Sequence, residues 1–472
     1  IEGILIEGVE EVLVCDATNY EFLLRLKRAR ATPPFEPRPL VDLVPFLALE
    51  QGLIGGGDDL SGFTECLDRL LLLPASAGLW ESEIFPARMA RYQPPFLDSL
   101  MQEGEILWFG LEGQKSCFAY HQDLDLWPAP TEILSDPDEG DGAEKALPTP
   151  KSGRLDFVEM RERSGLNSEE LHQVIWDAVW KTEVTNDGFM ALRKGILNRF
   201  ELPKGVPSAP RPRHRRPVRS GRGQDRRMQG ALPVAGRWHH LDLGTTEDLI
   251  DEEETRKDRV RLLLDRYGIL FRELLTREAE GFQWRTLFRT LRLMELSGEL
   301  YSGYFFEDIP GPQFISPSAF RRLQQLDPAQ VGIFWLCAQD PISPCGLPLE
   351  SLKGRLPRRV ASNHLVYRGS DCILVSQRLG KDIEIRAKPD DSDLVNALSD
   401  FDHLLNRQFQ GVIETRQTLK RVLPGTLLAV LLALGIMQLP LPGFFQSALA
   451  ILVGGLVMLP FIWPEIKLLV RL

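Results

Sequence analysis

The alternation of hydrophobic and polar positions predicts a repeated unit, in which helices are followed by two short strands. The clearest copy contains a long helix over 284–297 and a hairpin over 299–307. Within this helix Leu287, Leu291 and Met294 recur at spacings of three and four residues, which places them on one face. We therefore expect a helix that packs through one side and leaves the other side exposed.

Two earlier segments predict the same unit. A helix over 95–103 ends at a glycine, and strands over 105–109 and 116–120 follow it. Further along, Asn167 or Ser168 caps an amphipathic helix, and Glu170 has the spacing of a capping box relative to Asn167. Helices followed by a hairpin are the parts of a winged helix, so the fold class is predicted as α+β with tandem winged-helix domains.

The remaining segments complete the predicted organisation. Residues 331–390 are rich in strands and indicate a small antiparallel sheet or barrel. The predicted division is an N-terminal helical segment (1–60), a winged-helix-like domain (61–128), an acidic linker (129–152), a winged-helix domain (153–204), a basic Pro/Arg-rich linker (205–246), a winged-helix domain (247–330), a β-barrel-like domain (331–415) and an apolar helical hairpin (416–472).

The apolar hairpin is predicted from a run without charge. Residues 422–463 contain no Asp, Glu, Lys, Arg or His, and one membrane crossing takes about 20 residues. A Pro/Gly turn lies in the middle, and Lys and Arg flank both ends, which predicts two spans with both ends in the cytoplasm. The alternative is a helical hairpin buried in a soluble core. We therefore expect a cytoplasmic protein with possible membrane contact through 422–463.

Composition limits the chemistry. The 472 residues carry a formal net charge of −11, so any DNA site must be a local basic patch. The six cysteines form no C-x-x-C pair and predict reduced thiols. The P-loop, H-E-x-x-H, zinc-quartet and G-x-S-x-G motifs do not occur, so the chain alone predicts no ATP hydrolysis, no metal site and no cofactor. Because it begins with Ile, we expect it to be the C-terminal part of a longer protein.

Two groups of arginines are candidates for DNA binding. Arg285, Arg289 and Arg292 share the helix face opposite the apolar one, as a recognition helix requires. The alternative is a solvated face paired with Glu280 or Glu295. The second group lies in the basic linker and consists of Arg211, Arg213, Arg215, Arg216, Arg219, Arg222, Arg226 and Arg227. Such a run can neutralise phosphates, or bind anionic lipid, or serve only as a solubilising linker.

An enzymatic alternative is excision of a base from DNA. Such an enzyme needs a carboxylate or amide that orients water beside a flipped base. Asp340, Gln313 and Asp308 lie in predicted loops that suit this role, although a structural role in turns is favoured for each.

A series of short motifs resembles one known family. In order along the chain they are Leu72–Ser76, Leu79–Arg88, Phe96–Leu100, Gly104–Trp108, Ile175–Trp180, Glu183–Asp187, Arg266–Leu270, Tyr304–Glu307, Gly311–Phe314 and Gln339–Gly346. Their order and spacing resemble the large helicase-related (Lhr) family of superfamily 2 DNA helicases, between about residues 20 and 400. The apolar tail departs from what the family would be expected to show.

The resemblance implies a position and a function. Family members carry two RecA-like ATPase domains ahead of this region, so ATP and Mg²⁺ are expected for a helicase core that is absent here. The chain is then expected to be a DNA-binding accessory region of a helicase involved in DNA repair, with duplex or tailed DNA as its partner. The alternatives are a DNA glycosylase-like enzyme, since that region is similar to winged-helix glycosylases, and a membrane-anchored interaction scaffold.

Overall fold

The computed structural model describes seven parts of the chain. They are residues 2–3, 11–31, 35–89, 91–128, 153–201, 236–243 and 249–387. The acidic linker, the arginine run 211–227 and the apolar hairpin lie outside the described residues, so these three predictions stay predictions. Among the helices of the described ranges, none is long and apolar enough to cross a membrane.

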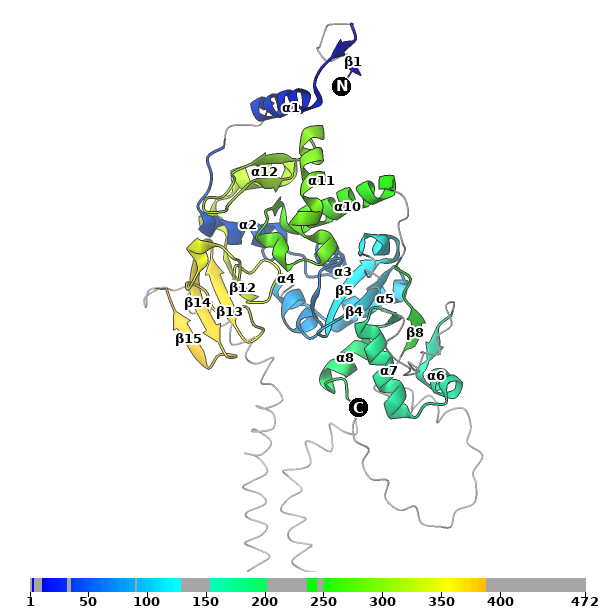
Figure 1. The fold of residues 1–472 in the computed structure, drawn as a ribbon. Coiled ribbons are helices and arrows are strands. Elements are labelled where there is room, and N and C mark those ends of the chain that lie inside the picture. Colours follow the sequence, from blue (N-terminus) through cyan, green and yellow to red (C-terminus); the bar gives the residue numbers. More distant parts are fainter. Residues whose placement is uncertain are drawn as a thin grey trace, which may run out of the picture. The chain divides into compact units, whose positions relative to one another are not determined.

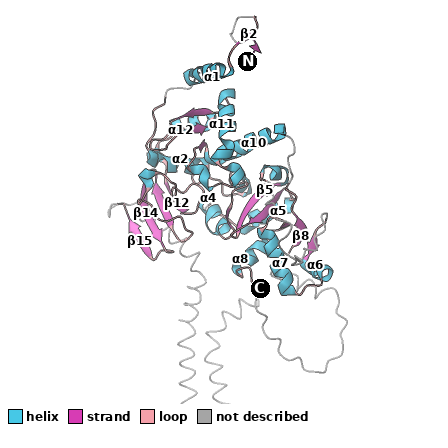
Figure 2. Cartoon of the chain, viewed as in Figure 1, coloured by secondary structure: helices cyan, strands magenta, loops and turns pink. Residues whose placement is uncertain are grey.

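Each winged-helix unit has its own three-stranded antiparallel sheet (Figures 1 and 2). The strand orders are β3–β5–β4 in the first unit, β6–β8–β7 in the second and β10–β11–β9 in the third. A separate four-stranded sheet has the order β12–β13–β14–β15, and a short pair joins β1 (Glu2–Gly3) to β2 (Leu13–Val14). The α+β class with tandem winged helices is thereby confirmed.

The first unit follows the predicted order of elements. Its bounds are α3 (Leu60–Asp68), β3 (Ala75–Ser76), the π-helix η2 (Trp80–Ile84), α4 (Phe85–Arg88), α5 (Pro94–Glu103), β4 (Ile106–Leu111), β5 (Lys115–Tyr120) and η3 (His121–Leu126). Gly104 ends α5 with a φ of +79°, a left-handed conformation that glycine adopts without strain.

The second unit begins with two capped helices. Its bounds are β6 (Leu155–Asp156), α6 (Phe157–Ser164), α7 (Ser168–Trp180), β7 (Val184–Asn186), α8 (Met190–Leu197) and β8 (Arg237–His240). The capping box of Asn167 and Glu170 forms as predicted. The sheet needs β8, which pairs with both β6 and β7, although 205–246 was predicted as linker. That prediction missed a strand because a four-residue stretch next to an arginine run carries little periodicity.

The third unit contains the predicted long helix. Its bounds are α10 (Leu249–Tyr267), β9 (Ile269–Leu270), η4 (Leu274–Arg277), η5 (Glu280–Phe282), α11 (Trp284–Ser297), β10 (Tyr301–Gly303), β11 (Gln313–Ile315) and α12 (Pro317–Gln325). The N-terminal elements are α1 (Ala17–Ala31), η1 (Leu40–Asp42) and α2 (Leu43–Glu50). The backbone of Arg38, ahead of η1, bonds to Phe305 and Glu307 of the third unit.

The strand-rich segment forms an open sheet, which corrects the prediction of a barrel-like domain. Its bounds are η6 (Pro328–Gln330), β12 (Ile333–Cys337), η7 (Glu350–Leu352), β13 (His364–Arg368), β14 (Asp371–Gln377) and β15 (Asp382–Ile385). Within the described residues β12 and β15 are its two edges and do not pair with each other. Four short strands are too few to close a barrel that side chains could fill.

One hydrophobic core runs through several of these units. It includes Phe46 from α2, Phe109 from β4, Leu263 from α10, Leu291 from α11 and Leu365 from β13. A second core combines the first and second units, with Trp80, Trp108 and Trp176 among its members. Each core therefore contains residues from more than one unit of the described part of 1–387.

Candidate nucleic-acid interface

Helix α11 occupies the position of a recognition helix. It precedes the β10–β11 hairpin and ends at Gly298, whose φ of +85° lets the chain turn into that hairpin. Leu287, Leu291 and Met294 are buried beneath it. The opposite face carries the three predicted arginines, so the predicted division between a packing face and an exposed face is present.

The three arginines of this face have different surroundings. Arg285 pairs with Glu280, and both side chains are largely exposed, at 71% and 67%. Arg289 is exposed and forms no ion pair with any residue that the structure describes. Exposed ion pairs contribute about 0.2–1 kcal/mol at most, so Glu280 is a weak competitor for Arg285.

Arg292 has a partner that the sequence did not indicate. Its Nη2 lies 2.7 Å from Oε1 of Glu21 in α1, which also pairs with Arg25. The predicted alternative partner, Glu295, instead accepts a hydrogen bond from Ser302 at 2.8 Å. Helix α1 therefore contacts the C-terminal half of α11 and engages one of its three cations.

Other arginines are buried and join the units to each other. Arg266 is fully buried; its Nη1 lies 2.7 Å from Oε2 of Glu278, and its Nη2 donates to the backbone oxygen of Leu71 in the first unit. Tyr267 donates to the other Glu278 oxygen at 2.6 Å, and burial, followed by the Glu278 charge, raises the pKa of this phenol. One guanidinium thus connects the third unit to the first.

Arg88 makes a comparable connection to the four-stranded sheet. It binds Asp340 in the loop after β12 through Nη1 at 2.8 Å, and both side chains are 1% exposed. It also donates to the side chain of Gln51. Arg359 donates to the backbone oxygens of the same loop, including Asp340 at 2.9 Å, and Arg277 donates to Ser343 at 2.5 Å. Burial, with Arg359 nearby, lowers the pKa of Arg277 to about 9.

These contacts also place the residues considered for base excision. Asp340 is enclosed in its ion pair with Arg88, and the Gln313 amide is held by the backbone of Phe305 and Phe306. Asp308 is exposed, with a φ of +60°. Asp340 and Gln313 therefore have structural partners among the described residues, whereas Asp308 lies at an exposed turn.

A cavity of about 570 Å³ lies where the three winged-helix units meet. Its lining includes Trp127 and Trp180, together with the basic residues Lys115, Lys181 and Arg277 and the acidic residues Glu112 and Glu278. Two tryptophans, three basic residues and two acidic residues can provide stacking and polar contacts for a planar ligand. The sequence did not predict this cavity, because its lining comes from segments that are far apart in the chain.

The fold and this site define a class of protein with tandem winged-helix domains, of which the third displays arginines on the exposed face of its long helix α11. Two family models described as "Large helicase-related protein, winged-helix domain" match residues 41–129 and 250–332. These two domain matches, together with the curated relatives described next, support a C-terminal Lhr-type region. The resemblance seen in the ordered motifs is thereby confirmed.

Similar proteins include two curated relatives. One is the "Lhr helicase/ probable uracil glycosylase" of Mycolicibacterium smegmatis, 28% identical over 71% of this chain and 23% of the relative. Another is the "Lhr helicase/uracil glycosylase" of Escherichia coli K12, 26% identical over 77% of this chain and 24% of the relative. The chain spans about a quarter of the length of these relatives. Among solved structures, Streptomyces sahachiroi DNA glycosylase AlkZ matches 79% of this chain and 97% of its own, with 12% identity and a TM-score of 0.41.

Proposed function

We propose that this chain is a DNA-binding accessory region of an Lhr-type helicase and that α11 is its principal DNA contact. The observation that carries the proposal is the arginine face of α11, which lies at the recognition-helix position of a family winged-helix domain. In winged-helix and related proteins this helix enters the major groove or lies along the phosphates. Arginine suits both, because its planar fork binds phosphate or guanine with two hydrogen bonds.

The roles of the three arginines follow from their surroundings. Arg289 is exposed, so it contacts DNA without breaking an ion pair to a described residue. Arg285 exchanges the weak pair with Glu280 for a phosphate. Arg292 contributes when Glu21 of α1 releases it. The eight arginines of 211–227 would add contacts that do not depend on base sequence.

The wing has a smaller role in this proposal. Tyr304 is 66% exposed between β10 and β11, where its ring can contact sugar and phosphate. Glu307 and Asp308 follow in the same wing and repel phosphates. We therefore assign most of the binding energy to α11. Unwinding, with its ATP and Mg²⁺, is assigned to a helicase core outside this chain, and a role in DNA repair follows from that partnership.

Fluorescence anisotropy tests this proposal directly. The chain is titrated into labelled duplex, single-stranded and 3′-tailed DNA at 50 and 200 mM salt. A DNA-binding region that contacts several phosphates loses affinity steeply between these concentrations. Binding to none of the three DNAs at the lower salt concentration would overturn the proposal and favour a protein-binding scaffold.

A second candidate function is excision of uracil, which two observations favour. Both curated relatives carry glycosylase in their names. The cavity lined by Trp127 and Trp180 has a size and lining that suit an extrahelical base, and Glu112 is one of its lining residues. The test is incubation with uracil-containing DNA, followed by hot alkali. Cleavage that is lost in Glu112→Gln but kept in Glu103→Gln supports it, and intact DNA with the unmodified chain rejects it.

A further inference from the structure

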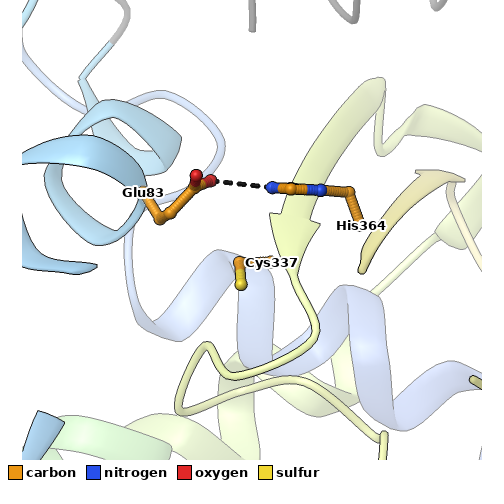
Figure 3. Close-up of side chains that lie close together, drawn as sticks. All are labelled: Glu83, Cys337 and His364. Carbon is orange, nitrogen blue, oxygen red and sulfur yellow. Dashed lines mark hydrogen bonds and ion pairs between the residues drawn. The ribbon is translucent and has the colours of Figure 1, made fainter. Parts of the chain in front are cut away.

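Three side chains that can bind a metal meet where the first winged-helix unit contacts the four-stranded sheet (Figure 3). Glu83 comes from the π-helix η2, Cys337 from the end of β12 and His364 from the start of β13. They are separated by up to 281 residues in sequence, so no spacing motif could have revealed them. Single-turn π-helices occur frequently at functional sites.

The strand register brings two of these residues together. Cys337 lies directly opposite His364 in the antiparallel β12–β13 pair, an arrangement that places both side chains on one face of the sheet. The π-helix then presents Glu83 to that face, with its Oε2 at 3.0 Å from Nε2 of His364. The sulfur, nitrogen and oxygen atoms all lie within 4.8 Å of one another.

The three polar side chains are buried, so folding removes them from water at a cost in free energy. The side chains of Glu83 and His364 are 3% and 4% exposed, and Cys337 is 1% exposed as a residue. A buried carboxylate beside a thiol and an imidazole lacks the hydration that it would have in water. A divalent cation among them would offset that cost and would draw all three atoms together.

We propose that Glu83, Cys337 and His364 bind a Zn²⁺ ion that fastens the first winged-helix unit to the four-stranded sheet. The donor set of one thiolate, one imidazole and one carboxylate suits Zn²⁺, whereas Mg²⁺ and Ca²⁺ require oxygen ligands. Tetrahedral Zn²⁺ places its ligand atoms about 3.3–3.8 Å apart, so the present atoms need to move by under about 1 Å.

The surroundings of the cysteine support a thiolate ligand. The backbone N–H of Gln339 points to the Cys337 sulfur at 3.5 Å, and such donors stabilise metal-bound thiolates. Arg359 holds the oxygen of the same Gln339 at 3.0 Å, which fixes the loop. Without a metal, burial, with Glu83 and Asp340 nearby, raises the pKa of the thiol to about 12. Zinc binding forms the Zn–S bond and releases the thiol proton to solvent.

A tetrahedral Zn²⁺ has four ligands, so a fourth ligand must come from outside Glu83, Cys337 and His364. Within the described residues the group contains no fourth His, Cys, Asp or Glu. A water molecule would complete the tetrahedron, as it does where zinc has three protein ligands. The burial of the site and its place between two units indicate a role in stability.

The first test is metal content and cobalt binding of the unmodified chain. After purification without added chelator, elemental analysis should find about one zinc per chain. Replacing zinc by Co²⁺ should give a thiolate-to-cobalt charge-transfer absorption in the near ultraviolet and the visible bands of tetrahedral cobalt. The proposal would be overturned if the purified chain held no zinc and the chelator-treated chain gave none of these bands on titration with Co²⁺. The trio would then be a hydrogen-bonded Glu83–His364 pair beside a thiol.

Variants then locate the ligands. Cys337→Ser and His364→Gln should each lower zinc content at least tenfold and abolish the cobalt bands, and Glu83→Gln should weaken binding. Cys372→Ser is the matched control, since Cys372 is a partly buried cysteine of β14 outside the trio. Equal zinc content in Cys337→Ser and Cys372→Ser would refute the assignment, even if all variants remain folded. Circular dichroism checks that each variant remains folded.

Discussion

Arginine occurs in two environments in this protein. Arg266 and Arg88 are buried and join units of the fold, whereas the arginines of α11 lie at the surface. Arg266 and Arg88 have carboxylate partners at 0% and 1% exposure. Arg285 and Arg289 lie at the surface of α11, where water solvates the charge. A buried guanidinium is committed to its partner because separating the two leaves an uncompensated charge. A surface guanidinium can exchange its partner for a phosphate, so only the second group is available to DNA.

The comparison predicts that the largest effect on stability comes from Arg266. In Arg266→Met the Glu278 charge and the Leu71 oxygen lose their buried partner. Breaking a buried pair costs about 3–5 kcal/mol of the free energy of unfolding. Urea unfolding measures the loss, with the exposed Arg355→Met as control. Equal urea midpoints for the two variants would contradict a connecting role for Arg266.

Asp340 should show a similar but somewhat smaller effect. Asp340→Asn leaves the Arg88 charge buried without a counterion and should lower the free energy of unfolding by about 3 kcal/mol. Asp308→Asn is the matched control, since Asp308 is exposed and asparagine tolerates its positive φ. A variant of Asp340 that unfolds like the unmodified chain, yet loses base excision, would instead assign Asp340 to catalysis.

The double variant Arg285→Glu/Arg289→Glu should show the opposite behaviour. Its free energy of unfolding should change by under about 1 kcal/mol, because each surface substitution contributes about 0.5 kcal/mol or less. Its affinity for duplex DNA should fall at least tenfold, since two cations near phosphates become anions. Anisotropy measures the affinity, and Arg355→Glu controls for the change in charge. If Arg355→Glu lost as much affinity, the effect would come from the change in net charge and not from the position of the arginines on α11.

The smallest expected effect concerns the contact between α1 and α11. Glu21→Gln removes the carboxylate that engages Arg292, a partly exposed pair worth about 0.2–1 kcal/mol. DNA affinity should rise up to fivefold as Arg292 becomes available, and amide hydrogen exchange in α1 should accelerate. Glu36→Gln, a carboxylate in the segment after α1, serves as control. Lower affinity in Glu21→Gln would show that α1 supports DNA binding.

Local patterns in the sequence predicted the elements well. The spacing of Leu287, Leu291 and Met294 predicted α11 with its observed bounds, and Asn167 with Glu170 predicted the start of α7. These features depend on residues three or four positions apart, which is the range over which a helix determines its own structure. The motif series likewise predicted the family.

Features built from distant segments were not predictable in this way. The partner of Arg292 is Glu21, 271 residues away, and the partner of Arg88 is Asp340, 252 residues away. The open sheet was predicted as a barrel-like domain because alternation along a strand does not reveal whether the edge strands meet. The trio proposed to bind a metal, Glu83, Cys337 and His364, could not be predicted either, since strand pairing brings Cys337 to His364 and Glu83 joins them only where the sheet packs on the first unit.

The salt dependence of DNA binding tests the central claim most directly. Affinity for one duplex is measured at several salt concentrations for the unmodified chain and for Arg289→Glu. Each phosphate contact contributes about −0.9 to the slope of log K against log salt. If Arg289 contacts a phosphate, its variant should bind more weakly with a slope that is shallower by about 1. Identical affinity and slope in the two proteins would contradict the account of α11 as the DNA-binding helix.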